Sequence, residues 1–422
     1  MRVLMFGWEF PPHISGGLGT ACYGLTKGLM EHGAEILFVL PRLFGCEEAG
    51  QMRMIGADES GLPEEFNRFI QKGSMRLLQV NTTLFPYATE ETYAADYQHS
   101  FNREQQKDHS AMGGGLTGLY GSGLMEEVYR YASIAPLIAK NHTFDVVHAH
   151  DWLTFPAGMA ASAQSGKPFV AHIHATEFDR SGSNPNMEVK RIEQQGMETA
   201  ERVIAVSEYT KKIAIKQYQI AENKVDVVHN GVLPSAVPTV FSDYKKFPVV
   251  VFLGRVTFQK GPEYFLYTAA RVLRQNPDVR FVLAGHGDKL LHMITLSAQL
   301  KISSRVSFTG FIQEQDIARL FGHADVYVMP SVSEPFGISA LEAARAGVPV
   351  IISRQTGVAE VLNSALKNDF WDTDGMADSI LALLKHGALN GWMSRKGQQQ
   401  ARLQTWNKAA SRVLKTYSQL QL

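Results

Sequence analysis

Short apolar runs that end at a glycine and lead into a helical pattern recur along this chain. The first run covers residues 3–6, Gly7 ends it, and a glycine-rich loop leads to a helical pattern over residues 18–30. The next apolar run covers residues 36–40. A strand, a loop, a helix and a strand in this order form a βαβ unit, which requires a parallel sheet. The sequence therefore predicts an α/β fold.

The apolar runs fall into two series. The first continues at residues 145–148, 168–172, 202–206 and 225–229, and the second covers residues 248–254, 280–284, 306–308, 326–329 and 348–352. Between them, residues 230–238 are rich in helix-breaking and strand-breaking residues, which indicates a linker. We therefore expect two doubly wound, Rossmann-like domains, over residues 1–238 and 239–404, followed by a helical segment over residues 405–422.

One segment interrupts this rhythm. Residues 86–125 are poor in apolar periodicity, and six glycines fall between Gly113 and Gly123. Long irregular segments within domains are either binding loops and lids or disordered chain. Both interpretations stay open for this insertion.

The charge balance limits the partners of the chain. Its 422 residues include 41 lysines and arginines and 41 aspartates and glutamates, so the net charge is zero. A neutral chain has no long-range attraction for nucleic acid or for an anionic membrane. No apolar run reaches the ~18–20 residues of a membrane span. The two cysteines, Cys22 and Cys46, form neither a disulfide framework nor a zinc pattern. We expect a cytoplasmic protein that binds no nucleic acid and has no integral membrane segment.

Two features of the first half of the chain are candidate ligand-binding or catalytic sites. Gly16 and Gly17 lie between a strand and a helix, where backbone amides can approach a phosphate, although a plain tight turn fits equally well. Histidines and an aspartate then end two successive strands, at the edge where open α/β sheets bind ligands. They are His148, His150, Asp151, His172 and His174.

These histidines allow three interpretations. His148 fits a histidine satisfied within the core, whereas His150, Asp151 and His174 lie closer to the loops and are candidate binding residues. Two His-x-His pairs with carboxylates nearby could also hold a metal ion. We expect no metal.

The second half carries basic residues and glycines after its first two strands. Arg255 and Lys260 follow Gly254, and a planar Arg fork beside a Lys point charge suits a diphosphate. The alternative is a pair of solvated surface charges. Gly285 and Gly287 follow the next strand and could let a planar base approach the backbone.

Two carboxylates eight residues apart form the most distinctive element. Glu334 lies in a loop, Phe336 and Gly337 lead into a helix, and Glu342 lies within that helix. A helix N-terminus favours anions, and carboxylates accept hydrogen bonds from the hydroxyls of sugars and ribose. A capped amphipathic helix with exposed glutamates is the alternative.

Together and in this order, these motifs resemble those of retaining GT-B glycosyltransferases of the family 4 and glycogen synthase type. The resemblance covers nearly the whole chain and rests on residues 16–19, 148–152, 254–261, 285–288 and 334–342. It implies two Rossmann-like domains that face a cleft, with the C-terminal helix returning to the N-terminal domain. It also implies that the C-terminal domain holds a nucleoside-diphosphate sugar.

The resemblance assigns roles to individual residues. Arg255 and Lys260 would stabilise the leaving diphosphate, and Glu334 would contact the sugar hydroxyls. Glu342 would bind the ribose, and His150 would contact the donor sugar near the reacting carbon. The remaining candidates would bind other parts of the substrate; they are Gly16, Gly17, Asp151, His174, Gly254, Gly285, Gly287, Phe336, Gly337 and Ile338.

The expected activity is metal-independent, retaining transfer of a hexosyl unit, glucosyl from UDP- or ADP-glucose, to a glucan or another glycoside. No cofactor is expected, and the Asp372-Thr373-Asp374 triplet is interpreted as a helix N-cap. Ile14 stands where bacterial glycogen synthases carry a lysine. The alternatives are therefore a different glycoside or lipid-linked acceptor, or a GT-B sugar-nucleotide epimerase. An NAD-dependent oxidoreductase is disfavoured because the G-x-G-x-x-G fingerprint is missing.

Overall fold

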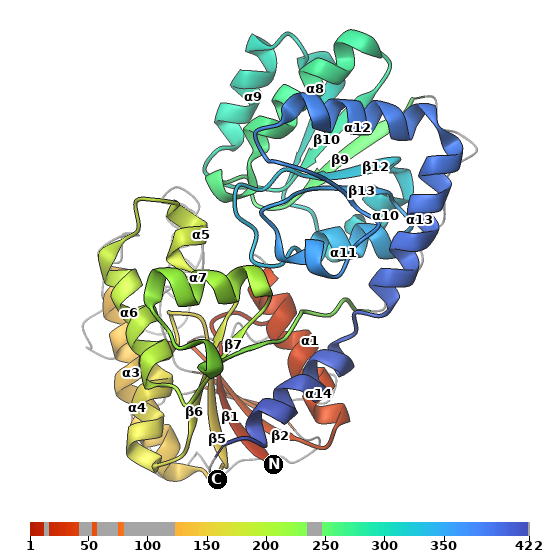
Figure 1. Ribbon diagram of the computed structural model, residues 1–422. Helices are drawn as coiled ribbons and strands as arrows, with labels where there is room; N and C mark the ends of the chain where they lie inside the picture. The colour runs from red at the N-terminus through yellow and green to blue at the C-terminus, as the bar shows by residue number, and fades with distance from the viewer. Residues whose placement is uncertain (12–16, 42–52, 57–74, 80–122, 234–246, 421–422) are drawn as a thin grey trace, which may run out of the picture. The chain divides into compact units, whose positions relative to one another are not determined.

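The computed structural model describes residues 1–11, 17–41, 53–56, 75–79, 123–233 and 247–420. It contains two sheets, each with helices around it (Figure 1). Contacts group the described chain into two compact units. The first comprises Met1–His172, Ile192–Val203 and Leu414–Leu422, and the second comprises Ile173–Arg191 and Ile204–Val413. The predicted boundary at residue 238 lies outside the described residues, and the predicted domain limits stay predictions.

The first sheet has eight strands in the order β3-β4-β2-β1-β5-β6-β7-β8, and the pairs from β3 to β6 are parallel. Its strands are β1 (Arg2–Phe6), β2 (Glu35–Leu40), β3 (Arg53–Gly56), β4 (Met75–Gln79), β5 (Val146–His150), β6 (Phe169–Ile173), β7 (Arg202–Ala205) and β8 (Val225–Val227). The intervening helices are α1 (Gly17–Glu31), α3 (Gly123–Asn141), α4 (Phe155–Ser165), α5 (Glu177–Ser181), α6 (Met187–Thr199) and α7 (Glu208–Tyr218), with a 3-10 turn η2 (Glu222–Lys224).

The second sheet has six strands in the order β11-β10-β9-β12-β13-β14, and all five pairs are parallel. Its strands are β9 (Val249–Leu253), β10 (Arg280–Ala284), β11 (Val306–Gly310), β12 (Val326–Met329), β13 (Val350–Ser353) and β14 (Leu366–Asn368). The helices are α8 (Pro262–Gln275), α9 (Leu290–Gln299), α10 (Glu314–His323), α11 (Ile338–Arg345), α12 (Thr373–Lys385), α13 (Gly387–Arg402) and α14 (Trp406–Tyr417), with 3-10 turns η4 (Phe258–Lys260), η5 (Ser303–Arg305) and η6 (Gly357–Glu360). The expected doubly wound α/β fold is confirmed.

Strand alternation explains why the second sheet is covered on both faces. On β9, Val250 and Phe252 belong to one apolar cluster and Val251 to another, and β12 divides its residues in the same way. The first cluster includes Phe265 of α8, and the second includes Leu341 of α11. A strand that buries side chains on both faces reads as a continuous apolar run, which is the pattern that predicted these strands.

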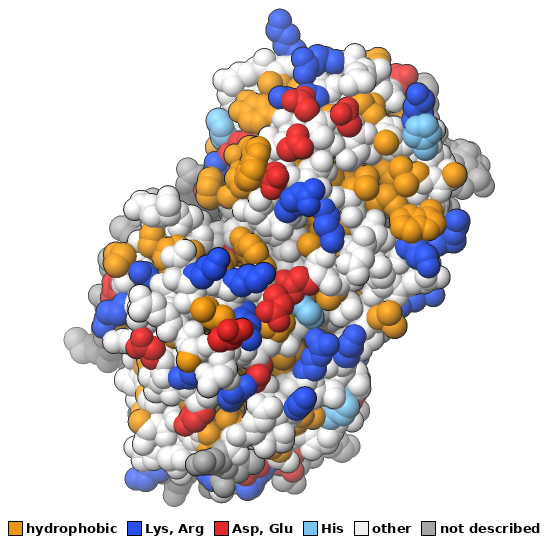
Figure 2. Space-filling model, in the orientation of Figure 1, with side chains coloured by type: hydrophobic (Ala, Val, Ile, Leu, Met, Phe, Trp, Pro, Cys, Tyr) orange, Lys and Arg blue, Asp and Glu red, His pale blue; other side chains and the backbone are white. Residues whose placement is uncertain are grey.

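The last residues of the chain belong to the first unit. Residues 414–422 group with Met1–His172, and Tyr417, at the end of α14, is fully buried. The expected return of the C-terminal helix to the N-terminal part of the chain is therefore seen in its last turn. Among the described residues, no helix is long and apolar enough to cross a membrane. On the face drawn in Figure 2, basic and acidic side chains are interspersed.

Candidate functional site

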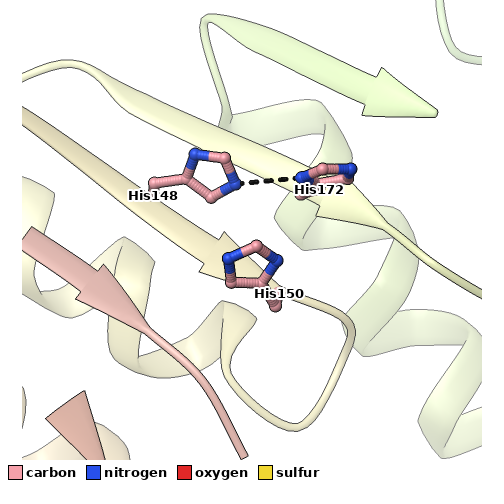
Figure 3. Close-up of side chains that lie close together, drawn as sticks. All are labelled: His148, His150 and His172. Atoms are coloured by element: carbon pink, nitrogen blue, oxygen red, sulfur yellow. Dashed lines mark hydrogen bonds between the residues drawn. The ribbon is translucent and has the colours of Figure 1, made fainter. Parts of the chain in front are cut away.

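The histidines that end β5 and β6 cluster in the first unit. His148 and His150 project from the same face of β5, as strand alternation predicts, and their ring centroids are 4.5 Å apart. The ring of His172, on β6, lies 5.2 Å from each of them. Figure 3 shows the three rings gathered between the two strands. All three residues are buried, and His150 is 0% exposed.

A hydrogen-bonded chain runs through two of these rings. The Tyr417 hydroxyl lies 2.5 Å from His148 Nδ1, and His148 Nε2 lies 3.1 Å from His172 Nδ1. Ring nitrogens of His148, His150 and His172 approach within 4.8 Å of one another, so their proximity alone could accommodate a metal ion. The hydrogen bonds give nitrogens of His148 and His172 another partner. The absence of a metal therefore stays a prediction.

Asp151 turns the chain out of β5. Its φ is 60°, a conformation that residues other than glycine adopt rarely and that clusters at functional sites. Its amide donates to the His172 carbonyl oxygen at 2.9 Å, and the Thr154 hydroxyl donates to the His150 carbonyl oxygen at 2.7 Å. These bonds fix the turn directly after His150, which is the last residue of β5 and so lies next to the loop, as predicted.

The glycine-rich loop is described only in part. Gly16 lies outside the described residues, and Gly17 is the exposed first residue of α1. The amide of Gly17 is therefore one of those at a helix N-terminus, which have no partner within the helix and favour anions. Most of the predicted insertion also lies outside the described residues, and α3 begins at Gly123, within the last residues of that segment.

In the second unit, the structure brings Lys260 and Glu334 together. Lys260 Nζ donates to Glu334 Oε2 at 2.5 Å, and the Ser331 hydroxyl donates to the same oxygen at 3.2 Å. Glu334 is 5% exposed, whereas Lys260 is half-buried at the end of η4. A buried carboxylate requires such partners, because an unpaired buried charge is strongly disfavoured. The cation and the carboxylate are 74 residues apart in sequence.

Backbone contacts hold the glycine loops of this unit against each other. A Cβ on Gly285 would lie 1.8 Å from the Gly254 carbonyl oxygen, and one on Gly287 would lie 2.5 Å from that of Val256. The Val256 amide donates to the His286 carbonyl oxygen at 2.9 Å. Only glycines permit this approach, so the two predicted loops form one structure. Arg255 lies half-buried within it.

Glu334 and Glu342 straddle the start of α11, as predicted. Gly337 caps this helix with φ = 104°, and Ile338 is the first helical residue. Both carboxylates influence Tyr327: burial raises the pKa of its hydroxyl, a hydrogen bond to Ser339 opposes this, and Glu334 and Glu342 raise it further. The Tyr327 hydroxyl lies 2.8 Å from that of Ser339, in the first turn of α11.

The loop that carries Glu334 is fixed by backbone bonds to the η6 segment. The Glu334 amide donates to the Gln355 carbonyl oxygen, the Gly357 amide to the Glu334 carbonyl oxygen, and the Val358 amide to the Phe336 carbonyl oxygen, all at 2.7–2.9 Å. Phe336 is buried in the second apolar cluster, the one that includes Leu341 of α11. These bonds position the backbone that carries Glu334, and a preorganised site requires such positioning.

Sequence reasoning missed a polar group beside Glu334. The Ser333 hydroxyl donates to Asp179 Oδ1 at 2.5 Å and lies 2.8 Å from the Tyr209 hydroxyl. Burial raises the pKa of Asp179, although hydrogen bonds from Ser333 and Thr176 oppose the shift. Ser333 and Asp179 are 154 residues apart, and nothing local in the sequence indicates that they meet.

Glu360 is a second residue that the predicted site omits. Its carboxylate accepts the amides of Glu208 and Tyr209 at 3.0 and 2.9 Å and lies 2.7 Å from His229 Nε2. Burial alone would raise the pKa of Glu360, but these hydrogen bonds outweigh it and lower the pKa. A carboxylate at the N-terminus of α7 also suits the positive end of that helix.

His174 makes stability depend on pH. Its Nδ1 atom is inaccessible to solvent, and burial lowers the pKa of the ring to about 3. The unfolded pKa is about 6.5, so the unfolded chain binds more protons as pH falls from 6.5 toward 3. The stabilising contribution is complete above about pH 6.5 and is lost below it. We expect a loss of about 2 kcal/mol at pH 5 relative to pH 7.5.

The measurement is the free energy of unfolding in urea at both pH values, for the wild type and for His174→Gln. The variant replaces the titrating ring with a neutral amide, so the difference between the two pH values should be smaller by that amount. An equal difference in the two proteins would show that His174 is not the titrating group.

Two family models match this chain. One, described as glycosyl transferases group 1, matches residues 239–400, and the other, glycosyltransferase family 4, matches residues 113–235.

Proteins with similar sequences include glycosyltransferases and glycogen synthases. A glycosyltransferase of Methanocaldococcus jannaschii is 29% identical over 90% of this chain and 87% of its own length. A glycogen synthase of Mycobacterium tuberculosis is 26% identical over 95% of this chain and 90% of its own length.

Solved structures share the fold. Sucrose-phosphate synthase from Thermosynechococcus elongatus superimposes with a TM-score of 0.73 at 17% identity, covering 99% of this chain and 98% of its own. Anabaena HepE in complex with UDP-glucose gives a TM-score of 0.68 at 16% identity, covering all of both chains. These likenesses cover both sheets, so the two-sheet architecture as a whole is shared.

Proposed function

Because the chain belongs to the GT-B glycosyltransferases of the family 4 and glycogen synthase type, we propose that it transfers a hexosyl unit from a nucleoside-diphosphate sugar, with retention and without a metal ion. The observation that carries this proposal is the contact of Lys260 with Glu334 beside the N-terminus of α11. A cation, a buried carboxylate and the N-terminus of a helix in one unit support the proposal.

The chemistry of transfer needs this combination. As the glycosidic bond to the diphosphate breaks, negative charge grows on the leaving phosphate and positive charge grows on the sugar ring. Lys260, Arg255 and the positive end of α11 would stabilise the first, in the role that Mg²⁺ has elsewhere. Glu334 would accept hydrogen bonds from the sugar hydroxyls, and Glu342 from the ribose.

The glycine loops after β9 and β10 would accept the nucleotide. Glycines have no side chain, so a planar base could approach the backbone of these loops closely. Gly254, Gly285 and Gly287 make up these loops in this chain. Gly17, the first residue of α1, and Gly16, which precedes it in the sequence, would face the diphosphate.

His150 would contact the donor sugar near the reacting carbon, with Asp151 and His174 beside the substrate. Because His150 is fully buried, this contact requires the surrounding chain to open and close around the donor. Its position at the carboxyl end of β5 is where open α/β sheets bind ligands.

We assign glucose as the transferred sugar, UDP- or ADP-glucose as the donor, and a glucan or another glycoside as the acceptor. The relative from Mycobacterium tuberculosis is a glycogen synthase, and HepE has been solved with UDP-glucose. A different acceptor is the main alternative. A D-inositol 3-phosphate glycosyltransferase of Mycobacterium sp. is 29% identical over 58% of this chain and 60% of its own length. A lipid-linked acceptor and a sugar-nucleotide epimerase are the others.

The test follows radiolabelled glucose from UDP-glucose and ADP-glucose into glycogen, with EDTA present and with the metal content of the protein measured. We expect label in the polymer, an α-linked product, less than one metal ion per chain and no loss of rate with EDTA. Conversion of the donor to an isomer without acceptor would support the epimerase instead. Transfer to inositol phosphate alone would move the acceptor assignment, and loss of rate with EDTA would contradict metal independence.

A further inference from the structure

We propose that Tyr417, at the end of the C-terminal helix α14, is a positioning residue for His150 and acts through His148 and His172. The inference rests on the proposed function, because it concerns the histidine assigned to the donor sugar. Its structural part concerns the first unit alone, to which all four residues belong. It gives a role in the site to the last turn of α14, where Tyr417 lies 267 residues after His150 in the sequence.

The direction of the hydrogen bonds follows from the Tyr417 hydroxyl. Among the described residues, its only hydrogen-bonding partner is His148 Nδ1, at 2.5 Å. Tyr417 is fully buried, and burial raises the pKa of its hydroxyl, so the hydroxyl keeps its proton. A buried hydroxyl must donate that proton to a partner. His148 Nδ1 is therefore the acceptor.

The tautomers of two histidines follow in turn. A neutral imidazole whose Nδ1 accepts carries its proton on Nε2. His148 Nε2–H therefore donates to His172 Nδ1, 3.1 Å away (Figure 3). His172 then accepts at Nδ1 and also carries its proton on Nε2. One hydroxyl thus fixes the tautomer of both rings.

The ring of His150 packs against the rings of both His148 and His172. Its ring stacks on His148 with an interplanar angle of 30° and lies at 32° to His172, with the centroids 4.5 and 5.2 Å away. The ring of Phe38 is stacked with that of His150 as well, with the centroids 6.5 Å apart. A ring packed in this way takes its orientation from its neighbours, and a reorientation of His148 or His172 would displace it. Misplacement by about 1 Å at a reacting centre can cost 10²-fold in rate.

The first experiment needs no substrate. In the full-length protein labelled with ¹⁵N-histidine, long-range ¹H–¹⁵N correlations identify the tautomer of each ring, with assignments from His148→Gln and His172→Gln. We expect Nε2–H tautomers for His148 and His172. In Tyr417→Phe, which removes only the hydroxyl, we expect this pattern to be lost and the His150 signals to move. Unchanged tautomers with unmoved His150 signals would overturn the proposal.

The second experiment separates positioning from stability. Tyr131→Phe is the matched control, because Tyr131 is also fully buried in the first unit and its hydroxyl donates to the Val39 carbonyl oxygen at 2.8 Å. Both variants should lower the melting temperature. Only Tyr417→Phe should lower kcat, by about tenfold, with KM for UDP-glucose within about twofold of the wild type.

Two kinetic outcomes would contradict the proposal: equal kcat losses in both variants, or a rise in KM alone. If the wild type transfers no sugar from UDP- or ADP-glucose, the proposed function fails instead. The NMR experiment still decides the hydrogen-bonded chain in that case, so the two failures are distinguishable.

Discussion

Lys260→Ala is expected to lower the rate of glycosyl transfer by about 10²–10³-fold, because it removes a fixed cation from the point where the leaving diphosphate gains charge. In the structure, Lys260 is held against Glu334 at 2.5 Å, so the ammonium group is positioned before any substrate arrives. The variant also leaves the buried Glu334 carboxylate without its cation. The loss should fall mainly on kcat, since the interaction strengthens as the bond breaks.

The matched control is Arg271→Ala. Arg271 also pairs with a carboxylate of the second unit, Asp374, but it lies nine residues into α8, about 14 Å along the helix axis from its start. We expect this control to keep transfer close to the wild-type rate. Steady-state kinetics with UDP-glucose and ADP-glucose measure both variants, and near-wild-type turnover in Lys260→Ala would remove the assignment of its role.

The strands that pack on both faces could be predicted from the sequence. The apolar runs at residues 280–284 and 326–329 coincide with β10 and β12. A strand covered on both faces is a continuous apolar run, without alternating polar residues, and is therefore easy to recognise in the sequence. β14 was missed, since its three residues, Leu366–Asn368, include only one apolar side chain. β3 and β4 were missed as well, for their sequences RMIG and MRLLQ mix charged and apolar residues without a clear period.

The candidate site could be predicted only where it is local. The glycine loops and the carboxylates around α11 are short segments whose chemistry is visible in the sequence, and the Asp372 cap of α12 was expected and is present. The contacts between segments were not visible. Asp179 meets Ser333 because tertiary packing brings the two segments together, and no spacing rule connects residues 154 positions apart. The same holds for Tyr417 and His148, which are 269 positions apart.

Gly285→Ala is expected to destabilise the second unit by more than about 4 kcal/mol, a cost that only a few mechanisms produce. The added Cβ would lie 1.8 Å from the Gly254 carbonyl oxygen, and φ at this position is +137°, where an L side chain is strained. The backbone of the loop after β9 would have to move. Because Arg255 lies in this loop, transfer should be lost together with stability.

Gly310→Ala is the control that separates the two causes of this cost. Gly310 pairs with Gly285 in an isolated bridge and has φ = +68°, but a Cβ there would meet nothing within 4 Å. Only the strain of the left-handed conformation remains, which costs about 1–2 kcal/mol. Urea unfolding of the two variants measures the difference. If Gly285→Ala costs no more than Gly310→Ala, the close approach of the two glycine loops is not a requirement of this fold.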